Sequence, residues 1–217
     1  MFEIKEINFG YEKDRLLLKN IHLSASPGEI IWLRGANGSG KTTLLRIITQ
    51  LIETDSQIYF KGRLSQSREE ILSQVTYIPS EPYLFDYLTG KENADFFQAL
   101  FDIPQDHFES FSTMIHQFGM DEALDQFVKD YSLGMRHKLY WSAVFARETS
   151  MYLLDEPFSP LDQDSQEVAM NMLINRAEQG SIILFVSHLN EISRKLATRS
   201  LVLENGELRE SEVLKEQ

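Results

Sequence analysis

Residues 35–42, which read Gly-Ala-Asn-Gly-Ser-Gly-Lys-Thr, have the residue types and the spacing of a phosphate-binding loop. Glycine lacks a Cβ, so the backbone can adopt positive φ angles and turn its N–H groups inward around a phosphate. Lys41 supplies a full positive charge to the β- and γ-phosphates, and the Thr42 hydroxyl is placed to ligate Mg²⁺. A glycine-rich turn before a capped helix would explain the glycines but not the lysine-threonine pair. The candidate phosphate-binding residues are Gly35, Asn37, Gly38, Ser39, Gly40, Lys41, Thr42 and Thr43.

The residues on either side of this loop have the patterns that a P-loop requires. Residues 29–34 form a short apolar run of strand type, and residues 43–51 place apolar side chains at helical spacing. The helix that begins at Lys41 adds free N–H groups and the positive end of its dipole at the same point. The sequence therefore predicts a strand, a P-loop and a helix in this order.

Two acidic residues, Asp155 and Glu156, follow the apolar run 151–154. A buried strand can deliver Asp155 to the sheet edge beside the P-loop, where its charge can hold the Mg²⁺ shell. Glu156 lies one residue further on, so its side chain points elsewhere and can polarise a water that faces the γ-phosphate. Such a pair alone is more often a helix-capping turn. Together with the P-loop, it predicts an ATPase core.

Two aromatic side chains could complete this site. His188 follows the strand-like run 182–186, and from the carboxyl end of that strand it can hydrogen-bond the γ-phosphate. A lone histidine is more often structural. Tyr11 lies in a turn upstream of the P-loop strand, where it could stack on a purine ring or be an ordinary surface residue.

The composition is that of a globular protein and argues against several functions. The 217 residues include 33 acidic and 21 basic ones, and the formal net charge of −12 has the wrong sign for a protein that binds nucleic acid. The absence of cysteine excludes a disulfide framework and a thiol nucleophile, and it suits a reducing cytosol. The chain opens without a signal-peptide pattern, and its apolar runs are too short to cross a bilayer.

Strand and helix patterns alternate along the chain in an order that predicts an α/β fold. Strand patterns occur at residues 2–9, 18–25, 57–62, 74–78, 151–154 and 182–186, with a helix at 163–179 between the last two. This βαβ order predicts a parallel core, and Asn205-Gly206 predicts a β-hairpin. Helix patterns fill residues 85–147, which we expect to form an inserted lobe whose phenylalanines make a small core. Residues 1–217 would then be one domain, with 1–84 and 148–217 as the catalytic core.

Further motifs follow the P-loop in a fixed order. They are Tyr-Ser-Leu-Gly-Met at 131–135, Leu-Leu-Asp-Glu-Pro at 153–157, Ser-Pro-Leu-Asp at 159–162 and Ser-His at 187–188. This series resembles the nucleotide-binding domain of ABC transporters and spans almost the whole chain. The resemblance implies a P-loop NTPase fold of the RecA-like type, with a mainly parallel sheet, an N-terminal antiparallel β region and the inserted helical subdomain.

The resemblance also implies a role for each candidate residue. Tyr11 would stack on adenine, Asp155 would be the Walker B acid, Glu156 the catalytic base and His188 the switch histidine. Residues 159–162 would be the D-loop, which crosses the dimer interface. Ser132 and Gly134 would belong to the signature motif, which caps the γ-phosphate bound by the other subunit. The residues themselves agree with this role, because Ser132 precedes a helical run whose free N–H groups would face an anion.

Two positions depart from the family pattern. The signature has Leu133 and Met135 where the family has Gly and Gln, and this variant resembles two-component exporters of the ABC-2 type. Ser80 stands where the family has a metal-binding Gln, and its shorter side chain would reach Mg²⁺ through a bridging water. The segment 81–87 that follows would border a groove for a helix of the membrane subunit. Its apolar side chains could equally be buried beneath the lobe.

The resemblance implies an ATP-binding subunit that hydrolyses MgATP at the interface of a head-to-tail dimer and powers a separate membrane permease. The dimer could be a homodimer or a heterodimer. The subunit would be cytoplasmic and peripheral on the inner face of the cell membrane, and no nucleic acid is expected as a partner. The alternatives are a regulatory ABC-type ATPase without a transport role and a binding module that hydrolyses ATP weakly.

Overall fold

The computed structural model describes residues 1–12 and 14–213, with the side chains of all of these except residues 105–108. It divides into two compact units. Unit 1 comprises Met1–Tyr77, Thr149–Glu156 and Leu173–Gln217, and unit 2 comprises Ile78–Glu148 and Pro157–Met172. The chain thus passes twice from the first unit to the second.

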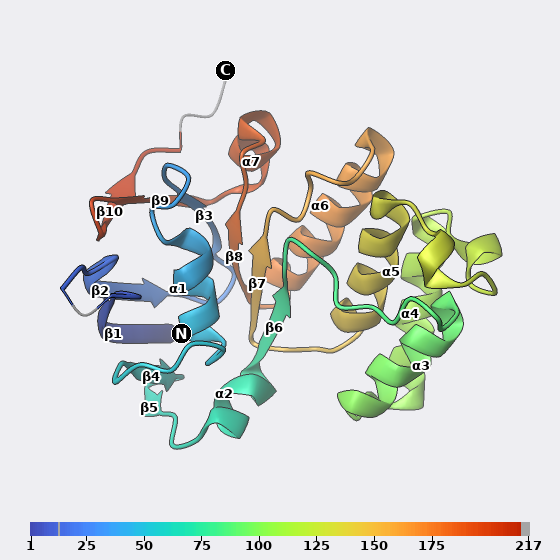
Figure 1. Cartoon of the computed structure of the whole chain (residues 1–217), viewed down its shortest axis with the longest axis horizontal. Coiled ribbons are helices and arrows are strands. Elements are labelled where there is room, and N and C mark those ends of the chain that lie inside the picture. Colours follow the sequence, from blue (N-terminus) through green and yellow to red (C-terminus); the bar gives the residue numbers. More distant parts are fainter. Residues whose placement is uncertain (13, 214–217) are drawn as a thin grey trace. The chain divides into compact units, whose positions relative to one another are not determined.

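A six-stranded sheet forms the centre of unit 1, in the order β10-β9-β3-β8-β7-β6. Figure 1 shows β3, β8 and β7 side by side, and all three run parallel. Almost every side chain of these strands is buried, as expected for a parallel sheet that is covered on both faces. The strands are β3 (Ile30–Arg34), β6 (Val75–Ile78), β7 (Met151–Asp155), β8 (Ile182–Val186), β9 (Arg199–Glu204) and β10 (Glu207–Ser211).

A second, four-stranded sheet of unit 1 is antiparallel and follows the order β2-β1-β4-β5. Its strands are β1 (Phe2–Phe9), β2 (Leu18–Ala25), β4 (Gln57–Phe60) and β5 (Arg63–Leu64). In β2 buried residues alternate with exposed ones over Ile21, Leu23 and Ala25, so one face of this sheet packs inward.

The core of unit 1 is one apolar cluster that joins both sheets to helix α1 (Lys41–Ile48). Leu44, Leu45, Ile47 and Ile48 are fully buried there, so the helix that follows the P-loop is fixed by packing. Two shorter helices, α2 (Arg68–Gln74) and α7 (Asn190–Leu196), complete the unit together with the end of α6 (Gln163–Glu178).

Unit 2 is helical. Its helices are α3 (Gly90–Leu100), α4 (Gln105–Gln117), two short 3₁₀ helices at Asp121–Ala123 and Val128–Asp130, and α5 (Leu133–Phe145), with the first part of α6. Phe97, Phe111 and Phe118 are buried and form its core with Trp141 of α5. Phe96 is 38% exposed, so not every phenylalanine of this region belongs to the core.

The predicted fold class is confirmed, with a mainly parallel sheet, an antiparallel β region and helical insertion. The Asn205-Gly206 hairpin is confirmed too, since Glu204 pairs with Glu207 across a two-residue turn in which both φ angles are positive. The sequence did not predict β5, α2 or α7, which are two to seven residues long. No helix among the described residues is long and apolar enough to span a membrane.

Asn93 of α3 fixes the segment that precedes this helix. Its side chain is fully buried; Oδ1 accepts a hydrogen bond from the Phe85 N–H (2.8 Å), and Nδ2 donates to the carbonyl oxygens of Phe85 (3.1 Å) and Thr89 (2.9 Å).

We predict that Asn93→Ala lowers the free energy of unfolding by about 2–3 kcal/mol, because it leaves buried polar groups of the segment without partners. Urea denaturation measures this loss. Asn171→Ala, at an exposed position of α6, is the control and should change stability by less than about 0.5 kcal/mol; equal effects would contradict the role of Asn93.

Candidate nucleotide-binding and catalytic site

The parallel register of β3, β8 and β7 brings three loops of unit 1 to one edge of the sheet. Leu33 pairs with Val186, and Val186 pairs with Asp155. The P-loop, the Ser187-His188 segment and the acidic pair therefore begin at the same level, at the carboxyl ends of neighbouring strands. In open α/β sheets this edge is where ligands bind.

The P-loop has a backbone that only glycine adopts without strain at its key positions. Gly35, Gly38 and Gly40 have φ angles of 148°, 77° and 105°. A Cβ on Gly35 would lie 2.4 Å from the carbonyl oxygen of Leu203, and one on Gly40 would lie 2.9 Å from a methyl carbon of Leu18. The loop thus combines positive φ angles, which would strain any residue other than glycine, with close packing, and both explain the glycine pattern.

Lys41 is held at the centre of this loop. Its Nζ donates hydrogen bonds to the carbonyl oxygens of Gly35 (2.9 Å) and Ala36 (3.0 Å), and the residue is 7% exposed. These two hydrogen bonds therefore orient the ammonium group within the P-loop. Asn37 and Gly38 are exposed at the turn of the loop, whereas Thr43 is buried in the first turn of α1.

Thr42 and Asp155 meet across the site. The Thr42 hydroxyl donates a hydrogen bond of 2.7 Å to Oδ2 of Asp155, which is 3% exposed. A hydroxyl and a carboxylate are hard oxygen donors, and Mg²⁺ usually takes one or two such groups while phosphates and waters fill its other positions. No cluster of three His, Cys, Asp or Glu side chains suited to a metal occurs in the described part of the chain. The donor set fits Mg²⁺ that arrives with a phosphate.

Glu156 has an unusual backbone. Its φ angle is +52°, a left-handed conformation that is uncommon for residues other than glycine and that often marks functional sites. Its N–H still donates to the Val186 carbonyl oxygen (2.9 Å), so the chain turns sharply while it remains bonded to β8. Burial raises the pKa of Glu156 above its ordinary value, and the neighbouring Asp155 adds to the rise, whereas the His188 N–H and ring oppose it.

His188 contacts this carboxylate twice. Its backbone N–H donates to Oε2 of Glu156 (3.1 Å), and its Nε2 lies 3.3 Å from Oε1, a contact without hydrogen-bond geometry. The side chain of His188 is 59% exposed. The indole N–H of Trp32 donates to the Ser187 carbonyl oxygen (3.1 Å), which ties the histidine loop to β3. The acidic residue and the histidine thus form a pair next to the P-loop.

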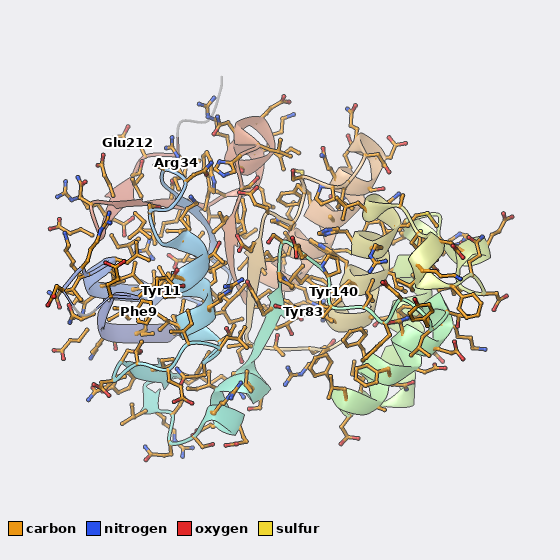
Figure 2. The ribbon with its side chains drawn as sticks, in the orientation of Figure 1. Phe9, Tyr11, Arg34, Tyr83, Tyr140 and Glu212 are labelled. Carbon is orange, nitrogen blue, oxygen red and sulfur yellow. The ribbon has the colours of Figure 1, made fainter. Side chains whose placement is uncertain are left out.

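Tyr11 lines a cavity of about 470 Å³ together with Gly38 and Ser39 of the P-loop. Its ring is 68% exposed, packs edge-on against Phe9 at 5.0 Å, and has its hydroxyl 3.2 Å from Oγ1 of Thr43 (Figure 2). The cavity has the size of a small-molecule site. An exposed ring face beside a phosphate loop suits the stacking of a nucleobase.

The sequence did not predict three further residues that line this cavity. Asn205 and Gly206, in the β9–β10 turn, line it, and so does Lys19. Lys19 donates from its backbone N–H to the Gly206 carbonyl oxygen (2.8 Å) and from Nζ to the Asn205 carbonyl oxygen (3.0 Å). The Asn-Gly pair indicates the hairpin, but no local signal indicates what the turn packs against.

The signature residues lie in unit 2, at the start of α5. Ser132 is the N-cap of this helix, and its Oγ accepts a hydrogen bond from the Met135 N–H (3.2 Å). Ser132 is exposed, and Leu133 is 60% exposed. The helix start, with its free N–H groups, therefore faces outward from this unit and can bind an anion.

Ser80 also lies in unit 2, and it is exposed. The His137 side chain, which is 1% exposed, faces the Ser80 backbone. Burial lowers the pKa of His137 to about 4, and the Ser80 backbone opposes this shift, so the imidazole is neutral near pH 7.

The segment after Ser80 is exposed. Tyr83, Phe85 and Tyr87 are 59%, 48% and 81% exposed, and the Tyr83 ring packs edge-on against that of Tyr140, 6.5 Å away (Figure 2). The sequence leaves open whether Tyr83, Leu84, Phe85 and Tyr87 are exposed or buried beneath the lobe; the three rings are exposed, whereas Leu84 is half-buried.

The exposed ring of Tyr11 leads to a prediction. We expect Tyr11→Ala to raise the Kd for ATP about tenfold, because stacking of a base on an aromatic ring contributes about 1–3 kcal/mol. Tyr11→Phe keeps the ring and loses only the contact with Thr43, so its Kd should stay within about twofold of the wild type. Equilibrium binding of a fluorescent ATP analogue measures both. Equal losses in the two variants would show that the ring face is not what binds the base.

Comparison with known proteins identifies the family. The ABC transporter family model matches residues 18–159, well over half of the chain. EcsA, an ABC-type transporter ATP-binding protein of Bacillus subtilis, is 29% identical over 223 residues, which cover 100% of this chain and 88% of EcsA. A solved structure of the ATP-binding subunit of an ABC transporter superposes with a TM-score of 0.90 at 24% identity and covers 98% of this chain and 90% of its own.

A second solved structure is a dimeric post-hydrolysis state of an ATP-binding cassette with bound ADP and Pi. It superposes with a TM-score of 0.84 at 21% identity, over 98% of this chain and 99% of its own. At these identities the two structures show the same fold. The family match and the fold agree with the P-loop geometry, and the chain belongs to the ABC transporter family as an ATPase subunit.

Proposed function

We propose that this subunit hydrolyses MgATP at the interface of a head-to-tail dimer and thereby powers a separate membrane permease, in an exporter. The observation that carries the proposal is the arrangement at one sheet edge of Lys41, the Thr42–Asp155 pair and the Glu156–His188 pair. These groups supply a cation, oxygen ligands and a base, which are the parts that phosphoryl transfer needs.

Binding of the triphosphate would use the P-loop. The backbone N–H groups of the loop and of the α1 start would surround the β-phosphate, and Lys41 would contact the β- and γ-phosphates. Thr42 and Asp155 would hold Mg²⁺, which when bound would neutralise charge on the phosphate oxygens. Tyr11 would stack on adenine in the adjoining cavity. Ser80 replaces the metal-binding Gln of the family, and its side chain is too short to ligate Mg²⁺ without a bridging water.

Hydrolysis would use Glu156 as the base. Its carboxylate would accept a proton from a water molecule as the water oxygen attacks the γ-phosphorus, and the bond to the leaving ADP oxygen would break. The contacts of His188 with both carboxylate oxygens would orient Glu156, and the exposed imidazole could donate to a γ-phosphate oxygen. Asp155 is bonded to the Thr42 hydroxyl instead, so the two adjacent acids would have different tasks.

The dimer would complete the site. In unit 2, Ser132 and Gly134 lie at an exposed helix start, which suits binding of the γ-phosphate held by a second molecule. A protein of the same fold has been described as a dimer with ADP and Pi. Loss of the γ-phosphate would then remove the contact and reopen the dimer. The partner could be a second copy or a related subunit.

The transport role rests on the family and on one surface. The exposed rings of Tyr83, Phe85 and Tyr87 would form the contact with a helix of the permease, which would hold this subunit at the inner face of the membrane. The signature variant, with Leu133 and Met135, favours export. Co-purification in mild detergent would identify the permease.

A second candidate follows from Ser80, namely a module that binds ATP but hydrolyses it weakly. Steady-state phosphate release with the purified permease distinguishes the two. Turnover that increases in the presence of the permease supports the transporter, and release that stays at background level supports the weakly hydrolytic module.

Replacement of the base tests the catalytic assignment. We expect Glu156→Gln to bind ATP normally, to accumulate as an ATP-bound dimer and to lower turnover by a factor of about 100 or more, because the amide cannot accept the proton. Phosphate release and analytical ultracentrifugation measure these effects. Glu167→Gln makes the same chemical change at an exposed position of α6 and should leave turnover unchanged. Normal hydrolysis by Glu156→Gln would exclude Glu156 as the base.

Replacement of the N-cap serine tests the dimer site. Ser132→Arg should abolish ATP-dependent dimerisation, because a long side chain would occupy the place of the phosphate, whereas the monomer should still bind ATP at its own P-loop. Gln117→Arg adds the same side chain to an exposed position of α4 and should dimerise like the wild type. A Ser132→Arg protein that dimerises with ATP would place the γ-phosphate contact elsewhere.

A further inference from the structure

In unit 2, one face of α5 packs against the loop of residues 157–162. Gly134, Lys138 and Trp141 follow one another at steps of four and three residues, so they lie on the same side of the helix. Each of them contacts a different residue of the loop. The contacts run from the exposed helix start to the buried middle of α5.

The first contact is steric. A Cβ on Gly134 would lie 3.0 Å from the Pro160 carbonyl oxygen, so the loop backbone lies closer to the helix than most side chains would tolerate. The third contact is apolar, because the ring of Phe158, which is fully buried, lies 6.5 Å from that of Trp141. Glycine at position 134 thus has a packing role within its own subunit.

The middle contact is an ion pair. Nζ of Lys138 donates to Oδ2 of Asp162 (2.8 Å), and the Lys138 side chain is only 14% exposed. The Lys138 ammonium, followed by two hydrogen bonds from Ser165, holds the pKa of Asp162 well below its usual range. Oδ1 of Asp162 accepts these bonds from the Ser165 N–H (2.9 Å) and hydroxyl (2.7 Å). One carboxylate therefore joins α5 to the start of α6.

The loop is also fixed from within. The Gln166 amide donates to the carbonyl oxygens of Phe158 (3.1 Å) and Leu161 (3.0 Å), and the Leu161 N–H donates to that of Phe158 (3.1 Å). The carbonyl groups of Phe158 and Leu161 are thus bonded within the loop, and the end of the loop is bonded to Lys138 of α5.

We infer that Lys138 is a positioning residue, which holds the loop 157–162 and the start of α5 as one rigid element. This inference rests on the proposed function, in which both parts meet the second subunit. Lys138 is not among the residues that we assign to ATP binding. It acts through Asp162, so that the loop and the Ser132–Gly134 segment reach the partner's nucleotide together. Loss of the ion pair would leave ATP binding by the monomer intact and would weaken dimerisation.

The test uses the Glu156→Gln background, in which the ATP-bound dimer should accumulate. We expect Lys138→Met to raise the ATP concentration for half-maximal dimerisation about three- to tenfold, which is the lower part of the range for coupled residues in direct contact. The Kd of the monomer for a fluorescent ATP analogue should stay unchanged. Lys138→Arg, which keeps the charge, should restore dimerisation to within about twofold of the background.

A second variant isolates the ion pair from the helix cap. Asp162→Asn keeps an oxygen that can accept from Ser165, since Asn caps helices as well as Asp does, but it removes the charge that faces Lys138. It should weaken dimerisation like Lys138→Met, and the double variant should be no weaker than either single one. Effects that add would show that the two side chains act independently and would overturn the inference.

The possible failures are distinguishable. If the Glu156→Gln protein itself does not dimerise with ATP, the proposed function fails and the inference fails with it. If that protein dimerises and Lys138→Met dimerises equally well, only the inference fails. A lower melting temperature of Lys138→Met with unchanged dimerisation would show a purely structural ion pair and would also overturn it.

Discussion

The parallel register of β3, β8 and β7 is the constraint on which the site depends. Because the carboxyl ends of these strands lie at one level, segments that are about 120 and 150 residues apart in the sequence begin side by side. A shift of one residue in either pairing would turn Asp155 away from Thr42 and move Glu156 away from the Val186 carbonyl oxygen. The near-complete burial of these strands opposes such a shift, since every apolar side chain would leave its place in the core.

The two adjacent acids illustrate how local backbone geometry divides chemical roles. Asp155 is still part of β7, is almost fully buried and is bonded to the Thr42 hydroxyl. Glu156 leaves the strand through a left-handed residue, at a cost of about 1–2 kcal/mol, and its carboxylate meets His188 instead. Burial disfavours the ionised form of Glu156, which makes it a stronger base when it is ionised. The two acids therefore differ in role because their backbone conformation and surroundings differ, and not only because one is Asp and the other Glu.

Much of this fold could be predicted from the sequence, because its strongest signals are local. The glycine spacing of the P-loop, the apolar runs of β7 and β8 and the Asn-Gly turn each depend on a few neighbouring residues. The short elements α2 and α7 have weak periodicity and are stabilised by tertiary packing, so the sequence did not show them. Contacts between distant segments could not be predicted from the sequence either. Nothing in the vicinity of Asn205 indicates that its turn lines the cavity beside Tyr11, and nothing near Lys138 indicates Asp162 as its partner.

The two hydrogen bonds of Lys41 to carbonyl oxygens of its own loop mean that a phosphate does not meet a free ammonium group. Two of the three ammonium N–H groups are bonded to Gly35 and Ala36, so an incoming anion finds one donor free and competes with these carbonyl oxygens for the other two. This exchange reduces both the free energy gained when a phosphate binds and the barrier to its dissociation, because Lys41 has hydrogen-bond partners in both states. Because binding and release each exchange one hydrogen-bond partner of Lys41 for another, the loop suits a subunit that binds and releases nucleotide repeatedly.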